Sequence, residues 1–364
     1  MGERILLAAP ADPDRGENRR LYSVLEHALS GKEYIRIDRA EQLDGNFIRE
    51  NGIRRVLFAV DLGPDGTNTE YTRLLRRIRE DAHLLDGLIG GVITDADSEL
   101  YTKSAAAELV FAANMSGCTF VGKPLVEGTK SLRNFRVAAM NLGTDDLEEA
   151  YRDSAKKLAD SLEGFSWYRK KNPKILALHA SSHKTSNTYE LWRGVREHLE
   201  SSGEGPAVLA REIGLRNGTV YDCSGCSFNA CLHFGEQESC FYGGVMVEDV
   251  YPAVREADAI LMVCPNYNDA ISANMTAFIN RLTALYRKRQ FFDKAVFSII
   301  VSGYSGGDII ARQLISALNM NKNFYLPARF AMLETANDPG AAMKLPGIRE
   351  RIRGFAEHIR ETLS

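Results

Sequence analysis

Four cysteines stand close together in the second half of the 364-residue chain: Cys223, Cys226, Cys231 and Cys240. Two, four and eight residues separate the successive thiols. Thiolates are the usual ligands of iron–sulfur clusters and of closed zinc sites. The grouping therefore predicts a metal centre, with uncoordinated thiols as the alternative. The other two cysteines, Cys118 and Cys264, lie in or beside apolar runs, where we expect buried, unreactive thiols.

A hydroxyl-rich segment follows the apolar run 174–179 and leads into a helical pattern. Its polar residues are Ser181, Ser182, His183, Lys184, Thr185, Ser186, Asn187 and Thr188. Hydroxyls, an amide and the free N–H groups of a helix N-terminus form a cradle that suits a phosphate. The alternative is that Ser186 or Asn187 only caps the helix. No Walker A pattern is present, which argues against a nucleoside triphosphate.

Two further polar loops follow later apolar runs. One contains Pro265, Asn266, Tyr267, Asn268 and Ser272; the other contains Ser302, Gly303, Tyr304, Ser305, Gly306 and Gly307. An aromatic residue beside small polar residues suits a flat ring, and glycines let backbone N–H groups approach its heteroatoms. The alternative is a pair of ordinary surface turns. Together with the cradle, the loops indicate a mononucleotide with a planar ring, and no catalytic acid or base stands out.

Short β-branched runs alternate with helical patterns in both halves, which is typical of parallel sheets built from βαβ units. We expect two tandem flavodoxin-like domains of class α/β, each a doubly wound, five-stranded parallel sheet between helices. The domains span residues 1–165 and 172–364, with a cysteine-rich insertion at 216–250, and they meet near Glu163–Pro173. The expected strands are Arg4–Ala8, Tyr34–Ile37, Arg55–Val60, Leu88–Thr94, Thr119–Gly122, Lys174–His179, Ala207–Glu212, Ala259–Cys264, Ala295–Val301 and Phe324–Arg329.

The two halves also resemble each other. The run that begins at Arg4 reads against the run at Lys174, and the dipeptide Asn114-Met115 recurs as Asn319-Met320. This similarity predicts an internal duplication in which the second copy gained the cysteine-rich insertion.

The equivalent loops of the first half are acidic. They carry Asp12 and Asp14, then Asp61 and Asp65, then Asp95 and Asp97. Carboxylates gathered at one sheet edge repel a phosphate, so we expect the first half to bind no flavin and to be structural. The alternative is a two-component receiver domain that uses Asp12, Asp14, Asp61, Thr94 and Lys123.

Residues 174 to about 340 resemble the NADPH-dependent FMN reductases, a flavodoxin-like family that includes the iron–sulfur flavoproteins. Ser181, Lys184, Asn187 and Thr188 match the phosphate loop of that family, while Ala180, Ser182 and His183 depart from it. The later loop and helix match at Pro265, Tyr267, Ser272, Phe278, Ile279 and Arg281.

The resemblance implies FMN held by the three loops, with NAD(P)H as the hydride donor. It also implies a [4Fe–4S] cluster at the four cysteines, with zinc as the alternative. Because a flavin supplies the chemistry itself, no general base is required of the protein. The expected partner is a small electron acceptor (a quinone, metal, nitro compound or flavin) or a redox protein, and a homo-oligomer is compatible with this prediction. The alternatives are a non-enzymatic electron carrier and a ligand-sensing scaffold protein.

Composition agrees with a globular protein. Hydrophobic residues make up 45% and charged residues 26% of the chain. A net charge of −3 gives no reason to expect nucleic acid or a membrane surface as a partner. We see no signal peptide and no apolar run of membrane-spanning length, so the expected location is the cytoplasm.

Overall fold

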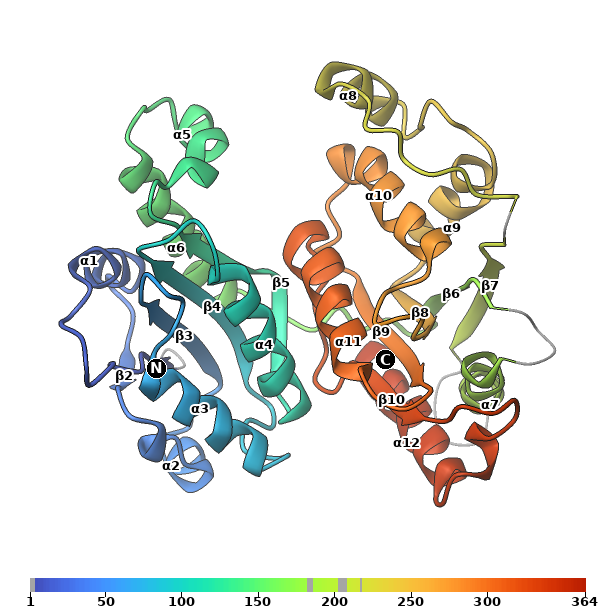
Figure 1. Ribbon diagram of the computed structural model, residues 1–364, viewed down its shortest axis with the longest axis horizontal. Helices are drawn as coiled ribbons and strands as arrows, with labels where there is room; N and C mark the ends of the chain where they lie inside the picture. Colours follow the sequence, from blue (N-terminus) through green and yellow to red (C-terminus); the bar gives the residue numbers. More distant parts are fainter. Residues whose placement is uncertain (1–3, 182–185, 202–207, 217) are drawn as a thin grey trace. The chain divides into compact units, whose positions relative to one another are not determined.

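The computed structural model describes residues 4–181, 186–201, 208–216 and 218–364. Contacts divide the chain into two compact units, Met1–Ser166 and Trp167–Ser364, called the first and second unit below. Each unit contains one five-stranded parallel sheet (Figure 1). Within the described ranges, no helix is long and apolar enough to cross a membrane.

The first unit has a sheet in the order β2-β1-β3-β4-β5. Its strands are β1 (Ile5–Ala8), β2 (Tyr34–Ile37), β3 (Arg55–Leu62), β4 (Ile89–Ala96) and β5 (Thr119–Gly128). Its helices are α1 (Arg19–Ala28), α2 (Gly45–Glu50), α3 (Thr69–Glu80), α4 (Thr102–Met115), α5 (Arg136–Leu142) and α6 (Leu147–Glu163). Helices α1 and α6 cover one face and α4 covers the other, so every residue of the central β4 is buried.

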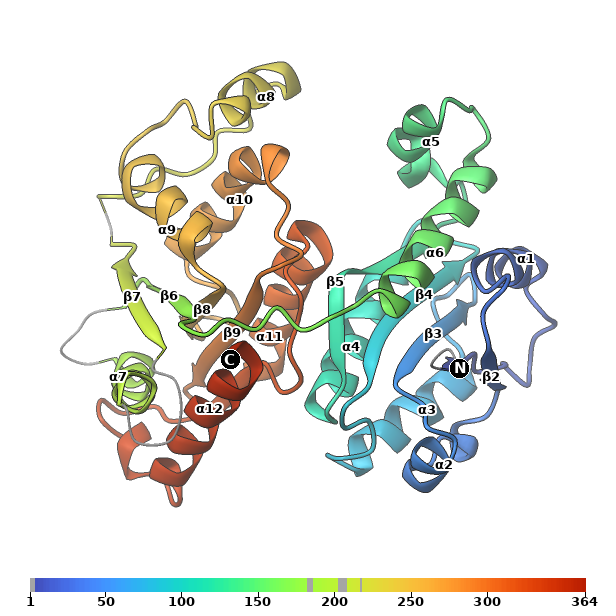
Figure 2. The same cartoon turned by 180° about the vertical axis from the view of Figure 1, so that it is seen from behind.

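The second unit has a sheet in the order β10-β9-β8-β6-β7. Its strands are β6 (Lys174–His179), β7 (Leu209–Gly214), β8 (Ala259–Pro265), β9 (Ala295–Ser302) and β10 (Ala331–Thr335). Its helices are α7 (Asn187–Glu200), α8 (Phe228–Glu236), α9 (Tyr251–Glu256), α10 (Ala273–Lys288), α11 (Gly307–Leu314) and α12 (Ile348–Leu363), with π-helical turns η3 (Met246–Val250) and η4 (Ile315–Met320). Helix α8 and the chain around it lie beyond α10, away from the sheet (Figure 2).

If the strands of each unit are numbered one to five along the chain, both sheets have the spatial order 2-1-3-4-5. This is the flavodoxin-like order. The prediction of two flavodoxin-like α/β sheets is therefore confirmed. Descent of the two halves from one ancestral copy stays a prediction.

The repeated Asn-Met dipeptide has the same role in both units. Asn114 ends α4 and donates its Nδ2 to the Cys118 carbonyl over 3.0 Å; Asn319 ends η4 and donates to the Phe324 carbonyl over 2.7 Å. Both asparagines are buried. The second turn is one residue longer, but each side chain ties the end of a helix to the chain that follows it.

The last strand of the second unit was predicted wrongly. Phe324–Arg329 is not a strand; the fifth strand is Ala331–Thr335. Only an isolated bridge, Ala295 to Tyr325, occurs in the predicted stretch. Pro327 has no N–H to donate to a ladder, and a turn follows it before the strand begins.

Candidate functional site

The three predicted loops of the second unit leave the sheet at one edge. Strands β6, β8 and β9 are parallel neighbours, with His179 in register with Val263 and Pro265 in register with Val301. Helices α7, α10 and α11 begin just beyond these strand ends. Because ligands of open parallel sheets bind outside the carboxyl ends of the strands, and helix N-termini attract anions, this edge is the candidate site.

Asn266 joins the loop after β8 to the loop after β9. Its Nδ2 lies 3.2 Å from Ser302 Oγ, 3.0 Å from the Ser305 carbonyl and 3.2 Å from Asp269 Oδ1. Its Oδ1 accepts the Asp269 backbone N–H over 2.8 Å. The side chain of Asn266, predicted to contact the cofactor, is thus used inside the protein. It fixes the position of both loops.

Glycine is required where these two loops meet. Gly306 has φ +85°, and a Cβ there would lie 2.2 Å from Asp269 Oδ1. Gly303 lies beside Asn337, and Gly307 is the first residue of α11. The glycines predicted from the sequence therefore permit the close approach of the loops.

Two tyrosines stand exposed on these loops. Tyr267 belongs to a small hairpin with Ala270, whose turn residues Asn268 and Asp269 have positive φ. The Tyr267 side chain is 55% exposed and the Tyr304 side chain 82% exposed. Rings that are held on rigid turns and exposed in this way are free to border a planar ligand.

Two hydroxyls at this edge have no hydrogen-bond partner among the residues that the structure describes. Ser181, at the end of β6, is 4% exposed, and its Oγ is unpaired. The buried Oγ of Ser272, at the start of α10, is unpaired as well. Buried polar atoms are usually paired in native proteins, and an unpaired one calls for a ligand or water.

The remaining cradle residues have assigned partners. Ser186 caps α7 by accepting the Tyr189 N–H, and its hydroxyl lies 2.8 Å from Thr188 Oγ1. Asn187 donates to the carbonyls of Ala336 and Asp338 over 3.2 and 2.9 Å, so its amide holds a neighbouring loop. The predicted residues Ser182, His183, Lys184 and Thr185 lie outside the described part of the chain.

Sequence reasoning missed a polar cluster beneath the cradle. His179 Nε2 lies 3.2 Å from Glu212 Oε1, and Glu212 also accepts from Tyr189 and Trp192, each over 2.9 Å. Burial raises the pKa of Glu212, but these hydrogen bonds and the charges of His179 and Arg196 outweigh it, so the pKa is lowered. The cluster anchors the start of α7. A histidine in the apolar run 174–179 was the available signal.

The four clustered cysteines line one cavity of about 260 Å³. Burial raises the pKa of the neighbouring Tyr251; Cys240, Cys231 and Cys223 add to the rise, and Arg281 opposes it. Among the described residues, however, no three His, Cys, Asp or Glu side chains are arranged to hold a metal ion. The described residues therefore show four thiols that line one cavity but no formed metal site, and the metal centre stays a prediction.

Helix α10 holds the cysteine-rich segment in place. Lys288 Nζ donates to the Glu236 carbonyl at the end of α8 over 2.8 Å, and Arg287 Nε lies 3.4 Å from Cys231 Sγ. Gly235 of α8 permits close contact, since a Cβ there would lie 2.7 Å from the Ala284 carbonyl. The other cysteines, Cys118 and Cys264, are buried as expected, and burial raises the pKa of Cys264 to about 12.

Residues 173–338 match the family model of NADPH-dependent FMN reductases. This part of the chain is similar to that family. No curated protein matches the sequence.

Several solved structures are similar to part of this chain at low sequence identity. An NAD(P)H:quinone oxidoreductase from Methanothermobacter marburgensis is 13% identical, with 52% of this chain and 99% of that chain covered and a TM-score of 0.39. An NADH:FMN oxidoreductase is 18% identical, with 53% and 91% covered and a TM-score of 0.36. An FMN-dependent NADH-azoreductase from Bacillus anthracis is 11% identical, with 52% and 99% covered and a TM-score of 0.35.

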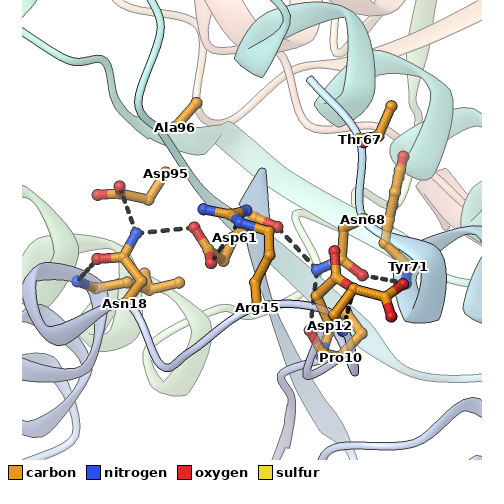
Figure 3. Close-up of polar contacts among 12 residues, drawn as sticks. Pro10, Asp12, Arg15, Asn18, Asp61, Thr67, Asn68, Tyr71, Asp95 and Ala96 are labelled. Atoms are coloured by element: carbon orange, nitrogen blue, oxygen red, sulfur yellow. Dashed lines mark hydrogen bonds and ion pairs between the residues drawn. The ribbon is translucent and has the colours of Figure 1, made fainter. Parts of the chain in front are cut away.

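The equivalent sheet edge of the first unit differs from that of the second unit. Figure 3 shows Asn18 between two carboxylates, donating to Asp61 Oδ1 over 2.8 Å and to Asp95 Oδ1 over 2.9 Å. Arg20 pairs with Asp95, and Arg15 lies 3.5 Å from Asp61. Burial raises the pKa of Asp61, although Asn18 and Arg15 oppose the rise. Asp61 and Asp95 are thus held by side chains of the protein itself.

The position of Lys123 does not support the receiver alternative for the first unit. Asp61 is in register with Asp95, which is in register with Gly128 at the end of β5. Lys123 lies earlier on β5, between Phe120 and Leu125, where the pairing of β5 with β4 is irregular. Its side chain is exposed. A receiver lysine must reach the acceptor aspartate at the carboxyl edge, and Lys123 is not at that edge.

Proposed function

We propose that the protein is an FMN-dependent NAD(P)H oxidoreductase that binds one FMN, at the carboxyl edge of the second unit's sheet. The observation that carries the proposal is the pair of buried, unpaired hydroxyls of Ser181 and Ser272 at this edge. The similarity of residues 173–338 to the reductase family supports it. The donors present suit a phosphate and a polar ring edge.

Each part of the site has a role in this proposal. The N-terminal N–H groups of α7, with the hydroxyls of Ser181 and Thr188, bind the phosphate. The exposed rings of Tyr267 and Tyr304 border the isoalloxazine, and Asn266 keeps their two loops together. When bound, FMN supplies the hydride transfer. The protein residues bind and orient the reactants.

The exposure of Tyr267 and Tyr304 indicates what kind of electron acceptor can reach the site. With Tyr267 and Tyr304 open to solvent, a small molecule reaches the edge of the site without the movement of a buried element. We therefore propose a small, flat acceptor that occupies the same place as the nicotinamide after it leaves. Quinones, nitro compounds and free flavins all meet this description.

Anaerobic reduction of the FMN-loaded protein tests the proposal. NADH or NADPH should bleach the flavin absorbance, and air or an added quinone should restore it. A flavin that dithionite reduces but neither nucleotide reduces would contradict an NAD(P)H oxidoreductase and would favour an electron carrier. The control is free FMN at the same concentration with the same nucleotide.

We further propose an iron–sulfur cluster, in preference to zinc, as the occupant of the four-cysteine cavity. Tetrahedral zinc needs four sulfurs about 2.3 Å from the metal and so about 4 Å from one another. The thiols line a cavity of about 260 Å³, and among the described residues no such close group of ligands has formed. A cavity of this size has room for a cluster, in which each sulfur binds a different iron. Equal amounts of iron and acid-labile sulfide after anaerobic purification support it, and zinc alone contradicts it.

A further inference from the structure

Arg281, in the middle of α10, carries a buried positive charge. Its side chain is 2% exposed and lines the cavity of the four cysteines. Among the described residues, no carboxylate forms an ion pair with it: Glu238 pairs instead with Arg255 and Arg289. A buried charge without a counter-charge is costly. The position of Arg281 therefore calls for a negative group nearby.

The hydrogen bonds of Arg281 go to both ends of the cysteine-rich segment. Nη1 donates to the Tyr221 carbonyl over 3.2 Å, and Nη2 donates to the Gly243 carbonyl over 2.7 Å. Tyr221 lies just before Cys223, and Gly243 lies just after Cys240. The buried Nε has no hydrogen-bond partner in the described part of the chain. One guanidinium thus fixes the two ends of the cysteine-rich segment. Its two partners are neutral carbonyls, so neither supplies a negative charge.

A second cation faces the same cavity. Arg287, also on α10, lines the cavity, with Nε 3.4 Å from Cys231 Sγ and its guanidinium 4.5 Å from the centre of the Phe228 ring. The described residues that line the cavity include four thiols and these two arginines, and none of them is a carboxylate. With neutral thiols, the cavity wall is net positive. An anionic occupant neutralises it.

We propose that the four-cysteine cavity binds its occupant as an anionic metal–thiolate group and that Arg281 is the positioning residue that supplies the buried counter-charge. Four thiolates outnumber the positive charge of either a zinc ion or an iron–sulfur core, so both occupants meet the requirement. The proposal rests on the metal centre of the proposed function for its occupant. It does not depend on FMN.

Two substitutions separate the charge of Arg281 from its hydrogen bonds. Arg281→Lys keeps the charge but loses the fork that spans two carbonyls, whereas Arg281→Gln keeps an amide donor and loses the charge. The matched control is Arg289→Gln, at the end of the same helix, where an exposed arginine pairs with Glu238 and does not line the cavity. Arg287→Gln removes the second cavity charge without touching the two carbonyls.

The full-length protein is titrated anaerobically with Zn²⁺ in competition with a chelator, and separately reconstituted with ferrous iron and sulfide. We expect Arg281→Gln to weaken Zn²⁺ binding about 10- to 100-fold, the range seen for groups that support metal ligands. Arg281→Lys, which keeps the positive charge, should bind Zn²⁺ more tightly than Arg281→Gln. In reconstituted protein, Arg281→Gln should lower the cluster reduction potential, because reduction adds negative charge. Arg289→Gln should change neither.

Three results would overturn the proposal. The wild type could bind neither Zn²⁺ nor a reconstituted cluster, Arg281→Gln could bind metal as tightly as wild type, or Arg281→Lys and Arg281→Gln could weaken metal binding equally. If Arg281→Gln does not fold, Arg287→Gln decides the matter, since weaker metal binding supports the proposal and unchanged binding overturns it. FMN content is measured on the same samples. Wild type that binds metal but no FMN counts against the proposed function and leaves this inference standing.

Discussion

Arg20 holds Asp95 through two hydrogen bonds, Nε to Oδ2 over 3.0 Å and Nη2 to Oδ1 over 2.6 Å. Asp95 is fully buried, near the carboxyl end of β4. In the second unit the corresponding edge offers the unpaired hydroxyls of Ser181 and Ser272. The first unit therefore pairs the carboxylates of Asp61 and Asp95 with its own side chains, whereas the second unit presents hydroxyls and no such carboxylate pair.

The first prediction concerns this ion pair. Asp95→Asn leaves the half-buried Arg20 without its counter-charge, and we expect the free energy of unfolding to fall by about 3 kcal/mol. Asp153→Asn, which breaks a surface pair with Lys157, is the control and should cost about 0.5 kcal/mol or less. Urea unfolding monitored by circular dichroism measures both. FMN binding by Asp95→Asn should equal that of wild type, and a loss of flavin would contradict the separation of the two units' roles.

The pH dependence of stability follows from Asp61. Its pKa is raised in the folded protein, mainly by burial. The folded state therefore binds more protons than the unfolded state in the window above the usual Asp pKa of about 3.9, and stability falls as pH rises through that window. Asp61→Asn removes this contribution. The stability of the variant relative to wild type should increase between pH 3 and neutral pH, measured by urea unfolding at several pH values, and a decrease would contradict the assignment.

FMN binding should tolerate the loss of the Ser181 hydroxyl but not a negative charge at this position. Ser181→Ala should weaken FMN binding by about 0.5–1.5 kcal/mol, because several donors share the phosphate. Ser181→Asp places a carboxylate against the phosphate and should weaken binding by about 100-fold or more. Ser201→Asp, at the other end of α7, is the matched control. Equal flavin content in purified Ser181→Asp and wild type would refute the cradle.

Gly306 tests the contact between the two ring loops. Gly306→Ala puts a Cβ 2.2 Å from Asp269 Oδ1 at a residue with φ +85°, so we expect a loss of about 1–3 kcal/mol in the free energy of unfolding and weaker FMN binding. Gly354→Ala in α12, where a Cβ meets nothing within 4 Å, should instead stabilise by about 0.5–1 kcal/mol. Thermal unfolding and FMN titration of both variants give the comparison. Similar effects of the two substitutions would contradict the loop geometry.

Much of the fold could be predicted from local patterns. Runs such as 174–179 and 259–264 are short, apolar and followed by polar loops, and parallel pairing then requires those loops to meet at one edge. The last strand was misplaced because an aromatic run resembled a strand, although Pro327 prevented the ladder from continuing.

The use of individual polar side chains could not be predicted in the same way. Asn187 bonds to Ala336 and Asp338, and Arg281 bonds to Tyr221 and Gly243, all far away in sequence. Such partners are set by tertiary contacts, which a local pattern does not reveal. Asn187 and Asn266 were therefore assigned to the cofactor, and the role of Arg281 was not foreseen.

The number of FMN molecules bound per chain tests the central claim most directly. Flavin-free protein of known concentration is titrated with FMN and followed by calorimetry or flavin fluorescence. The account predicts a single site per chain, because the carboxylates of Asp61 and Asp95 at the first unit's sheet edge repel a phosphate, whereas Ser181 and Ser272 of the second unit offer hydroxyls to it. Two sites per chain, or none, would contradict it.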